Sequence, residues 1–424
     1  MKETIRRPLR IATMVRGILP APRPDDIMYS PLDVAITVSE QLTRRGHGVS
    51  FYAAGGEGPR VTDFNRSSLR PIVQNNQDWQ NLLGSTDLFT DYLPSLYDQV
   101  LVQDMFKRAS EGEYDLLHFH HPEAAMPYAS LYPQVPVVYT LHDQLDQQRR
   151  ETIEAFMSPN QHFISISDNQ RRGAPDLPYA ATVYNGIDTK LFAPKGEPED
   201  YLLFVGRIVE YKGVKEAIQV AIKTKSRLLI IGQVQAADQW FFDTHVKPYL
   251  NDKILYLGMI DHDQLPRYYQ KARALLMPVL WEEPFGLTMV EAMACGTPVL
   301  AFHRGSIPEV VVDGKTGYVV ESVNAMAEAL GIVDQIKRAD CRKHVLANFS
   351  LNRMVDGYEN IFYDIVAADR LGRLQRQLSG TVKRAARPLT KIKQNQAATH
   401  PVKTARNKIQ GVKAKVSGRR NNKS

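Results

Sequence analysis

Short apolar runs alternate with amphipathic stretches along most of the chain. Residues 9–15 and 49–53 are dominated by apolar side chains, and each run has the length of a buried strand. Between them, apolar residues recur every four positions from Val34 to Leu42, which is the spacing of one helix face. A strand, a helix and a second strand in this order predict a βαβ unit that opens a parallel sheet.

This alternation continues to residue 192 and restarts after a linker. Residues 193–200 read Ala-Pro-Lys-Gly-Glu-Pro-Glu-Asp and form a linker by composition. Beyond them, apolar runs again alternate with helical stretches. We therefore predict an α/β protein with two doubly wound, Rossmann-like domains, residues 1–192 and 193–350, followed by a long helix over residues 351–369.

The composition fits this organisation. The chain has 424 residues, 43% of them hydrophobic, which is enough for two globular domains with separate cores. Cys295 and Cys341 offer neither a disulfide framework nor metal-ligand spacing, so we predict two packing residues in a reducing cytosol. The N-terminal residues lack the apolar core of a signal peptide, and no window approaches the roughly 18 apolar residues of a membrane span. We expect a cytoplasmic protein.

Positive charge is concentrated at the C-terminal end. The formal net charge is +7, but residues 370–424 contain sixteen Lys or Arg and no Asp or Glu, so residues 1–369 carry −9. A basic segment without a steady apolar period does not bury a core, and we predict that residues 370–424 are disordered. The anionic inner face of a membrane is the expected partner, because each cation near such a surface gains about 1 kcal/mol. No specific nucleic acid is expected, since the tail has no aromatic residue for base stacking.

Residues 281–299 combine two carboxylates with a helix start. Apolar residues recur at helical spacing after Gly286, so Glu283 lies just before a helix and Glu291 lies about two turns into it. The two acids can therefore contact different parts of one ligand. A capping role for Glu283 is the alternative interpretation.

Positive groups are predicted to face the same ligand. The N–H groups of Phe285, Gly286 and Leu287 form an anion site at the helix start, which suits a phosphate. Arg207 and Lys212 lie in a loop between a predicted strand and a predicted helix, spaced to project into one cleft. This loop is not a Walker loop, because Gly-x4-Gly-Lys-Ser/Thr is absent. A solvated charged loop is the alternative.

Histidines lie at two predicted strand ends in the first half. His118, His120 and His121 fall within a strand that runs out into a loop over residues 115–122, and His142 ends the next strand. In an open parallel sheet, this edge binds ligands. A zinc site is the alternative interpretation of three neighbouring histidines. Adjacent strand residues point to opposite faces and no fourth ligand is evident, so we predict no metal site.

Several of these motifs resemble those of one enzyme family. Glu283 and Glu291 match the Glu-x7-Glu motif of the retaining nucleotide-sugar glycosyltransferases of family four. Residues 118–122 resemble the family's His-x-His-x-Pro motif, and residues 304–309 resemble its Gly-x-x-Pro-Glu turn. The resemblance covers residues 9–369 and implies the GT-B fold, in which two Rossmann-like domains face a cleft.

The resemblance also implies a role for each of these residues. The implied donor-binding set contains Arg207 and Lys212 on the diphosphate, Glu283 on the sugar, the N–H groups of Phe285, Gly286 and Leu287 on the phosphate, Glu291 on the ribose, and Met259 and Ile260 on the base. His120 would face the reacting sugar, so His120 and Glu283 are the implied catalytic residues. The long helix over residues 351–369 would cross back onto the first domain.

The loop after the first strand departs from the family pattern. The family has a Gly-Gly pair there, whose backbone approaches the donor phosphates, whereas this chain has Tyr29 and Ser30 at the aligned position. Gly17 or the Ser30 backbone would have to substitute. Together with His142, these two residues form the expected acceptor side.

The implied activity is transfer of a sugar, with retention, from a nucleoside diphosphate sugar to a glycan, lipid or small metabolite. The donor is a co-substrate, and no cofactor or obligatory metal is expected, because Arg207, Lys212 and the helix start supply the positive charge. Two alternatives remain open. One is a nucleotide-sugar 2-epimerase of the same architecture, whose signature does not match residues 118–122, and the other is a non-enzymatic, basic-tailed nucleic-acid-binding protein.

Overall fold

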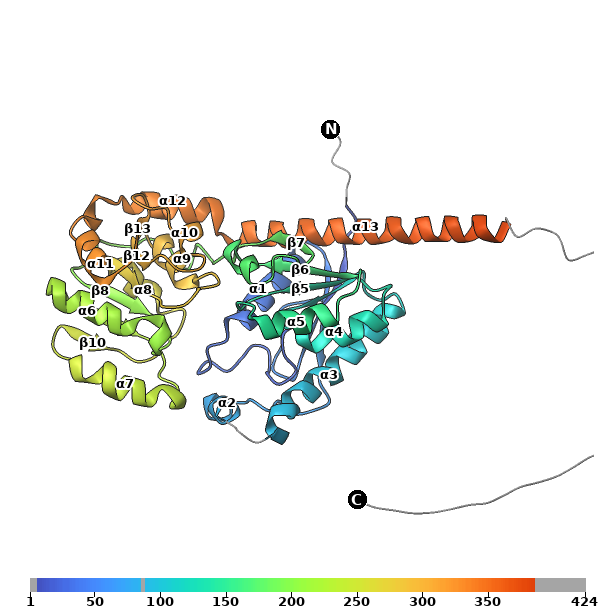
Figure 1. Ribbon diagram of the computed structural model, residues 1–424, viewed down its shortest axis with the longest axis horizontal. Helices are drawn as coiled ribbons and strands as arrows, with labels where there is room; N and C mark the ends of the chain where they lie inside the picture. The colour runs from blue at the N-terminus through green and yellow to red at the C-terminus, as the bar shows by residue number, and fades with distance from the viewer. Residues whose placement is uncertain (1–5, 85–87, 386–424) are drawn as a thin grey trace, which may run out of the picture. The chain divides into compact units, whose positions relative to one another are not determined.

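The chain folds around two parallel β-sheets (Figure 1). The computed structural model describes residues 6–84 and 88–385. The first sheet has seven strands and the second has six, and the strand pairs within each sheet are parallel. Two parallel Rossmann-like sheets confirm the predicted fold class.

The strands follow the chain in two groups. The first sheet contains β1 (Arg10–Met14), β2 (Gly48–Ala53), β3 (Asp63–Arg66), β4 (Leu116–Phe119), β5 (Val137–Thr140), β6 (Gln161–Ser165) and β7 (Tyr179–Thr182), in the order β3-β2-β1-β4-β5-β6-β7. The second contains β8 (Leu202–Val205), β9 (Leu228–Ile231), β10 (Ile254–Tyr256), β11 (Ala274–Met277), β12 (Val299–Phe302) and β13 (Gly317–Val320), in the order β10-β9-β8-β11-β12-β13.

The α-helices connect the strands. They are α1 (Ser30–Arg44), α2 (Asn76–Leu83), α3 (Leu88–Ser110), α4 (Pro122–Leu131), α5 (Gln147–Ala155), α6 (Val214–Thr224), α7 (Gln239–His245), α8 (Pro266–Lys271), α9 (Leu287–Ala294), α10 (Ile307–Val310), α11 (Val323–Leu330), α12 (Arg338–Asn348) and α13 (Leu351–Ala385). In the first half, α3 and α4 share one core with the sheet, and α1 and α13 share another. In the second half, α9 and α12 line one core, and α6 and α11 line the other.

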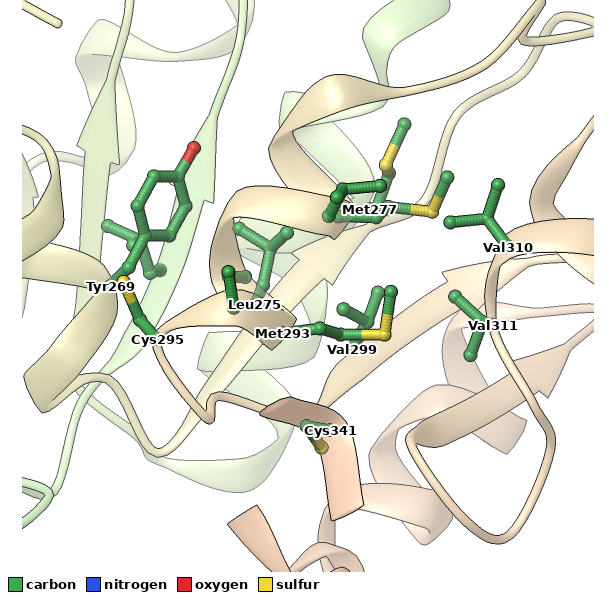
Figure 2. Close-up of a cluster of buried hydrophobic side chains, with 14 of the residues drawn as sticks. Tyr269, Leu275, Met277, Met293, Cys295, Val299, Val310, Val311 and Cys341 are labelled. Carbon is green, nitrogen blue, oxygen red and sulfur yellow. The ribbon is translucent and has the colours of Figure 1, made fainter. Parts of the chain in front are cut away.

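Figure 2 shows the core beneath α9. Leu275 of β11 and Val299 of β12 are fully buried there, and burial of each such side chain contributes about 1.5–3 kcal/mol. Cys295 and Cys341 are both free and buried, as predicted for packing residues. The ring of Tyr269 lies beside Cys295 and belongs to the same core (Figure 2). This packing fixes α9, which carries Glu291, against the sheet.

The last helix, α13, extends beyond the boundary predicted at residue 369. Tyr358 and Phe362 pack into the core of the first sheet, and the Thr140 hydroxyl donates to the Tyr358 hydroxyl at 3.2 Å. The compact part of the chain ends at Leu371, whereas the helix runs to Ala385. The remainder of the predicted tail, residues 386–424, lies outside the described residues.

Two local elements differ from the prediction. Strand β3 was not predicted, because residues 63–66 carry only one apolar side chain and pair at the edge of the sheet. Helix α1 begins at Ser30, before the first periodic apolar residue, because Pro31 fits the first turn of a helix. Within residues 6–84 and 88–385, no helix is long and apolar enough to cross a membrane.

Candidate functional site

The predicted donor-binding residues gather at one edge of the second sheet. Strands β8 and β11 are neighbours there, although β9 follows β8 in the chain, so the strand order reverses between them. Ligands of doubly wound folds bind beyond the carboxyl ends of such strands. Arg207 follows the end of β8, and residues 278–286 follow the end of β11. The topology therefore places both predicted segments at this edge.

The loop after β8 is fixed against the loop after β11. Gly213 has a φ of 79°, and a Cβ on it would meet the Pro278 carbonyl oxygen at 1.9 Å, so only glycine fits this approach. The N–H of Leu280 donates to the Tyr211 carbonyl at 2.8 Å. Arg207 donates to the Tyr211 hydroxyl and lies over its ring, with 5.5 Å from its Cζ to the ring centroid. Backbone and aromatic contacts thus fix the loop that carries Arg207 and Lys212.

Glu283 is buried between these loops. Its Oε2 accepts a hydrogen bond from Lys212 Nζ at 2.6 Å and another from Trp281 Nε1 at 2.9 Å. Among the residues that the structure describes, no donor is recorded for Glu283 Oε1. The carboxylate is therefore held through one oxygen and has the other available for a ligand hydroxyl.

The start of α9 has the geometry expected of an anion site. Gly286 caps the helix with a φ of 82°, a conformation that glycine adopts without strain. Within the described part of the chain, no acceptor is recorded for the N–H of Gly286 or Leu287. Phe285 is buried, and its carbonyl accepts from the Ser306 hydroxyl at 2.9 Å. This bond anchors the loop, so the free N–H groups point from a fixed backbone.

Glu291 is held by two residues that the sequence motifs did not reveal. Its Oε2 accepts from the Tyr269 hydroxyl at 2.8 Å, and its Oε1 lies 2.9 Å from His262 Nε2. The hydrogen bond to Glu291 raises the pKa of His262, against the opposing effect of burial. No periodicity or motif marked Tyr269 or His262 in the sequence. They lie 22 and 29 positions before Glu291, and separations of this length form no recognisable motif.

Met259 and Ile260 lie in the loop after β10, the outermost strand of the sheet beside β9. Both are half-buried, and Ile260 packs against the core that contains Tyr269. The loop after β10 is held to the end of β9 by a hydrogen bond from the Gly232 N–H to the Gly258 carbonyl at 2.9 Å. The predicted base-contacting backbone is thus part of an ordered loop.

The first sheet brings His118, His120 and His142 together. His120 Nδ1 lies 2.8 Å from His142 Nε2, and the rings of His118 and His120 have centroids 4.3 Å apart. His118 Nε2 is bonded to the Thr140 hydroxyl at 2.9 Å. His120 Nε2 is buried and has no partner among the described residues. Burial lowers the pKa of His120 well below the ordinary histidine value, so this ring is neutral.

His121 belongs to a different environment. Its Nδ1 lies 3.4 Å from Glu123 Oε2, and burial lowers the pKa of His121 to about 4. The three neighbouring histidines therefore do not converge on one point. Within the described ranges, no group of three or more His, Cys, Asp or Glu side chains could hold a metal ion.

Gly17 and Ser30, the two expected replacements for the family's Gly-Gly pair, differ in their surroundings. The N–H of Gly17 donates to Asp98 Oδ1 at 2.5 Å, and a Cβ at residue 17 would meet the Tyr97 carbonyl oxygen at 2.5 Å. In this structure the Gly17 N–H is thus already bonded. Ser30 is exposed at the first position of α1. The Ser30 N–H has no backbone acceptor among the described residues.

Two family models match the chain. Residues 34–191 match the model described as Glycosyltransferase Family 4, and residues 188–345 match the one described as Glycosyl transferases group 1. The two matches overlap at residues 188–191, just before the linker at residues 193–200. They contain every residue of the predicted donor-binding set, and His120 and His142 as well.

Individual proteins agree with the family models. The chain is 25% identical to N-acetyl-alpha-D-glucosaminyl L-malate synthase of Bacillus anthracis, over 80% of this chain and 95% of that protein. It is similar in fold to sucrose-phosphate synthase of Thermosynechococcus elongatus, with a TM-score of 0.64 and 20% identity over 88% of this chain and 100% of the other. It is also similar to Anabaena HepE in complex with UDP-glucose, with a TM-score of 0.58 and 16% identity over 86% and 100% of the two chains. These matches do not favour the epimerase or the nucleic-acid-binding alternative.

Proposed function

Because the chain belongs to the group 1 and family 4 glycosyltransferases of GT-B fold, we propose that it transfers a sugar, with retention, from a nucleoside diphosphate sugar to an acceptor. The observation that carries this proposal is the cluster of Arg207, Lys212 and Glu283 at the carboxyl edge between β8 and β11. A diphosphate and the sugar attached to it present the charge and the hydroxyls that such a cluster binds.

The cluster suits the charge changes of the reaction. When a glycosidic bond to a diphosphate breaks, positive charge develops on the sugar and negative charge grows on the leaving group. Arg207, Lys212 and the helix start at Gly286 would stabilise that negative charge from fixed positions. Fixed donors need little reorganisation as the charge develops. They also replace the charge of a metal ion, so the proposed transfer requires none.

Each proposed catalytic residue has one polar atom without a hydrogen-bond partner among the described residues, and these two atoms support the proposed roles. Glu283 Oε1 is available to accept from a hydroxyl of the donor sugar. The neutral His120 presents Nε2 without a partner in the described residues, and we assign it to the anomeric carbon and acceptor side. Glu291 would bind the ribose hydroxyls, with His262 and Tyr269 keeping its carboxylate in one orientation.

The relatives suggest which substrates to try first. UDP-glucose is the first donor, because the similar Anabaena HepE was solved with it. L-malate is the first acceptor, because the Bacillus anthracis relative is named for it. GDP and ADP sugars complete the donor panel, and phosphorylated polyols and lipid acceptors complete the acceptor panel.

The experiment is a thermal-shift screen followed by an assay of donor cleavage. A nucleoside diphosphate sugar that binds the native state at 100 times its Kd should stabilise the chain by about 2.7 kcal/mol. Lys212→Ala should lose the shift, whereas Lys253→Ala, which replaces an exposed lysine of the same half, should keep it. If no member of the panel shifts the wild-type Tm or is cleaved, the proposed function is wrong.

We also propose that residues 370–424 attach the enzyme to the anionic face of a membrane. The sixteen cations of this segment, without a single acid, support the proposal. Surface attachment would bring the site close to a lipid acceptor.

A further inference from the structure

Trp281 contacts two side chains of the proposed donor site, Glu283 and Lys212. Its Nε1 donates to Glu283 Oε2 at 2.9 Å, and the Lys212 ammonium lies over its ring, 4.7 Å from the centroid. Tyr211 supports the indole from the other loop, with ring centroids 5.2 Å apart. The indole therefore joins the carboxylate, the ammonium and the loop after β8 into one unit.

The carboxylate of Glu283 is oriented by this unit. Trp281 and Lys212 both donate to Oε2, so rotation of the carboxylate would break two hydrogen bonds at once. The backbone of Glu283 is also fixed, because its carbonyl accepts a hydrogen bond from the Ser306 N–H at 2.9 Å. The side chain of Glu283 is only 9% exposed, so both bonds form in a site from which water is largely excluded.

We propose that Trp281 is a positioning residue for sugar transfer, a role that rests on the proposed function. Its N–H holds Glu283 so that Oε1 faces the donor sugar, and its ring holds the Lys212 ammonium where the donor diphosphate binds. When a diphosphate accepts hydrogen bonds from Lys212, the indole N–H still donates to Oε2 of Glu283. Glu283 then keeps its orientation through the chemical step.

The two functions of the indole can be separated by substitution. Trp281→Phe keeps an aromatic ring under Lys212 but removes the N–H. Trp281→Leu removes both. Trp240→Phe is the matched control, because Trp240 is a 71% exposed tryptophan on α7 of the same half.

Binding and cleavage are measured with UDP and UDP-glucose, or with the GDP or ADP pair that stabilises the wild type most. Trp281→Phe should bind the nucleoside diphosphate within about threefold of wild type, because the cation–π contact persists. Its kcat for cleavage of the sugar donor should fall about tenfold to a hundredfold, as expected for a lost hydrogen bond to a charged group. Trp281→Leu should lose nucleoside diphosphate affinity as well, and Trp240→Phe should match wild type.

The outcomes separate this inference from the proposed function. A wild type that binds no nucleoside diphosphate overturns the proposed function and the inference with it. A wild type that binds and cleaves, together with an unchanged kcat in Trp281→Phe, overturns the inference alone. If Trp281→Phe lowers the nucleoside diphosphate affinity and the Tm as well as kcat, the tryptophan is merely structural. This result also overturns the inference.

Discussion

The Nζ of Lys212 lies 2.6 Å from Oε2 of Glu283, and the two residues stand 71 positions apart in the chain. This ion pair joins the proposed phosphate-binding loop to the proposed sugar-binding loop. The ammonium has three N–H donors, of which one is directed to Glu283. The other two are available to phosphate oxygens, so one lysine can contact both parts of a donor.

Lys212→Ala should therefore lower kcat/KM about thirtyfold to several thousandfold, because a charge contact in a desolvated site contributes roughly 2–5 kcal/mol. Steady-state cleavage of the sugar donor measures the effect. Lys253→Ala should leave kcat/KM unchanged. Wild-type turnover of Lys212→Ala would show that the lysine does not clamp the diphosphate.

Glu291→Gln should weaken donor binding more than it slows the bound complex. The amide can accept from only one of Tyr269 and His262, so the group that contacts the ribose loses its fixed orientation. Titration calorimetry gives the affinity, and single-turnover cleavage at saturating donor gives the rate. A collapse of the single-turnover rate with unchanged affinity would contradict ribose binding.

His120→Ala should abolish transfer while the protein stays folded and binds the donor. His118→Ala should instead destabilise the fold by about 1–3 kcal/mol, because it removes a buried hydrogen bond to Thr140. Urea unfolding and donor cleavage, measured on both variants, separate the two roles. Equal losses of activity in His118→Ala, His120→Ala and His121→Ala, or stoichiometric zinc in the purified protein, would indicate a structural or metal-binding cluster.

The His262–Glu291 pair should make stability depend on pH. The pKa of His262 is raised in the folded state, chiefly by the hydrogen bond to Glu291. Its contribution is therefore fully present below the ordinary histidine pKa and is lost as the pH rises through the raised value. The His262 side chain is 58% exposed, so this contribution should be about 1 kcal/mol or less.

Thermal unfolding of wild type and His262→Gln from acidic to alkaline pH measures this contribution. The difference in Tm between the two proteins should shrink as the pH rises. A Tm difference for His262→Gln that is constant or grows with pH would contradict the linkage.

Removal of the basic tail should release the protein from anionic vesicles. The comparison is between the full-length chain and a chain that ends at Leu371, which keeps the 3.0 Å contact between Arg370 and Asp115. Only the full-length chain should sediment with anionic vesicles at low salt, and high salt should release it. If both forms sediment equally, or neither does, the tail is not the membrane anchor.

The sequence by itself determined the two parallel sheets and the positions of the main motifs. Apolar runs and helical spacings are local signals, so they located β1, β2 and α9 without knowledge of the fold. Helical spacing likewise placed Glu291 within α9 and Glu283 before its start. Strand β3 was missed because an edge strand with little apolar character leaves no such signal.

Only the tertiary structure decided which side chains hold the two acids. Parallel strands bring their carboxyl ends to one edge whatever the length of the chain between them, so Lys212 reaches Glu283, and His262 reaches Glu291 from 29 positions away. It also decided that the Gly17 N–H bonds to Asp98, 81 positions away. Contacts of this kind depend on how loops from different strands pack together, and a spacing along the sequence does not encode them.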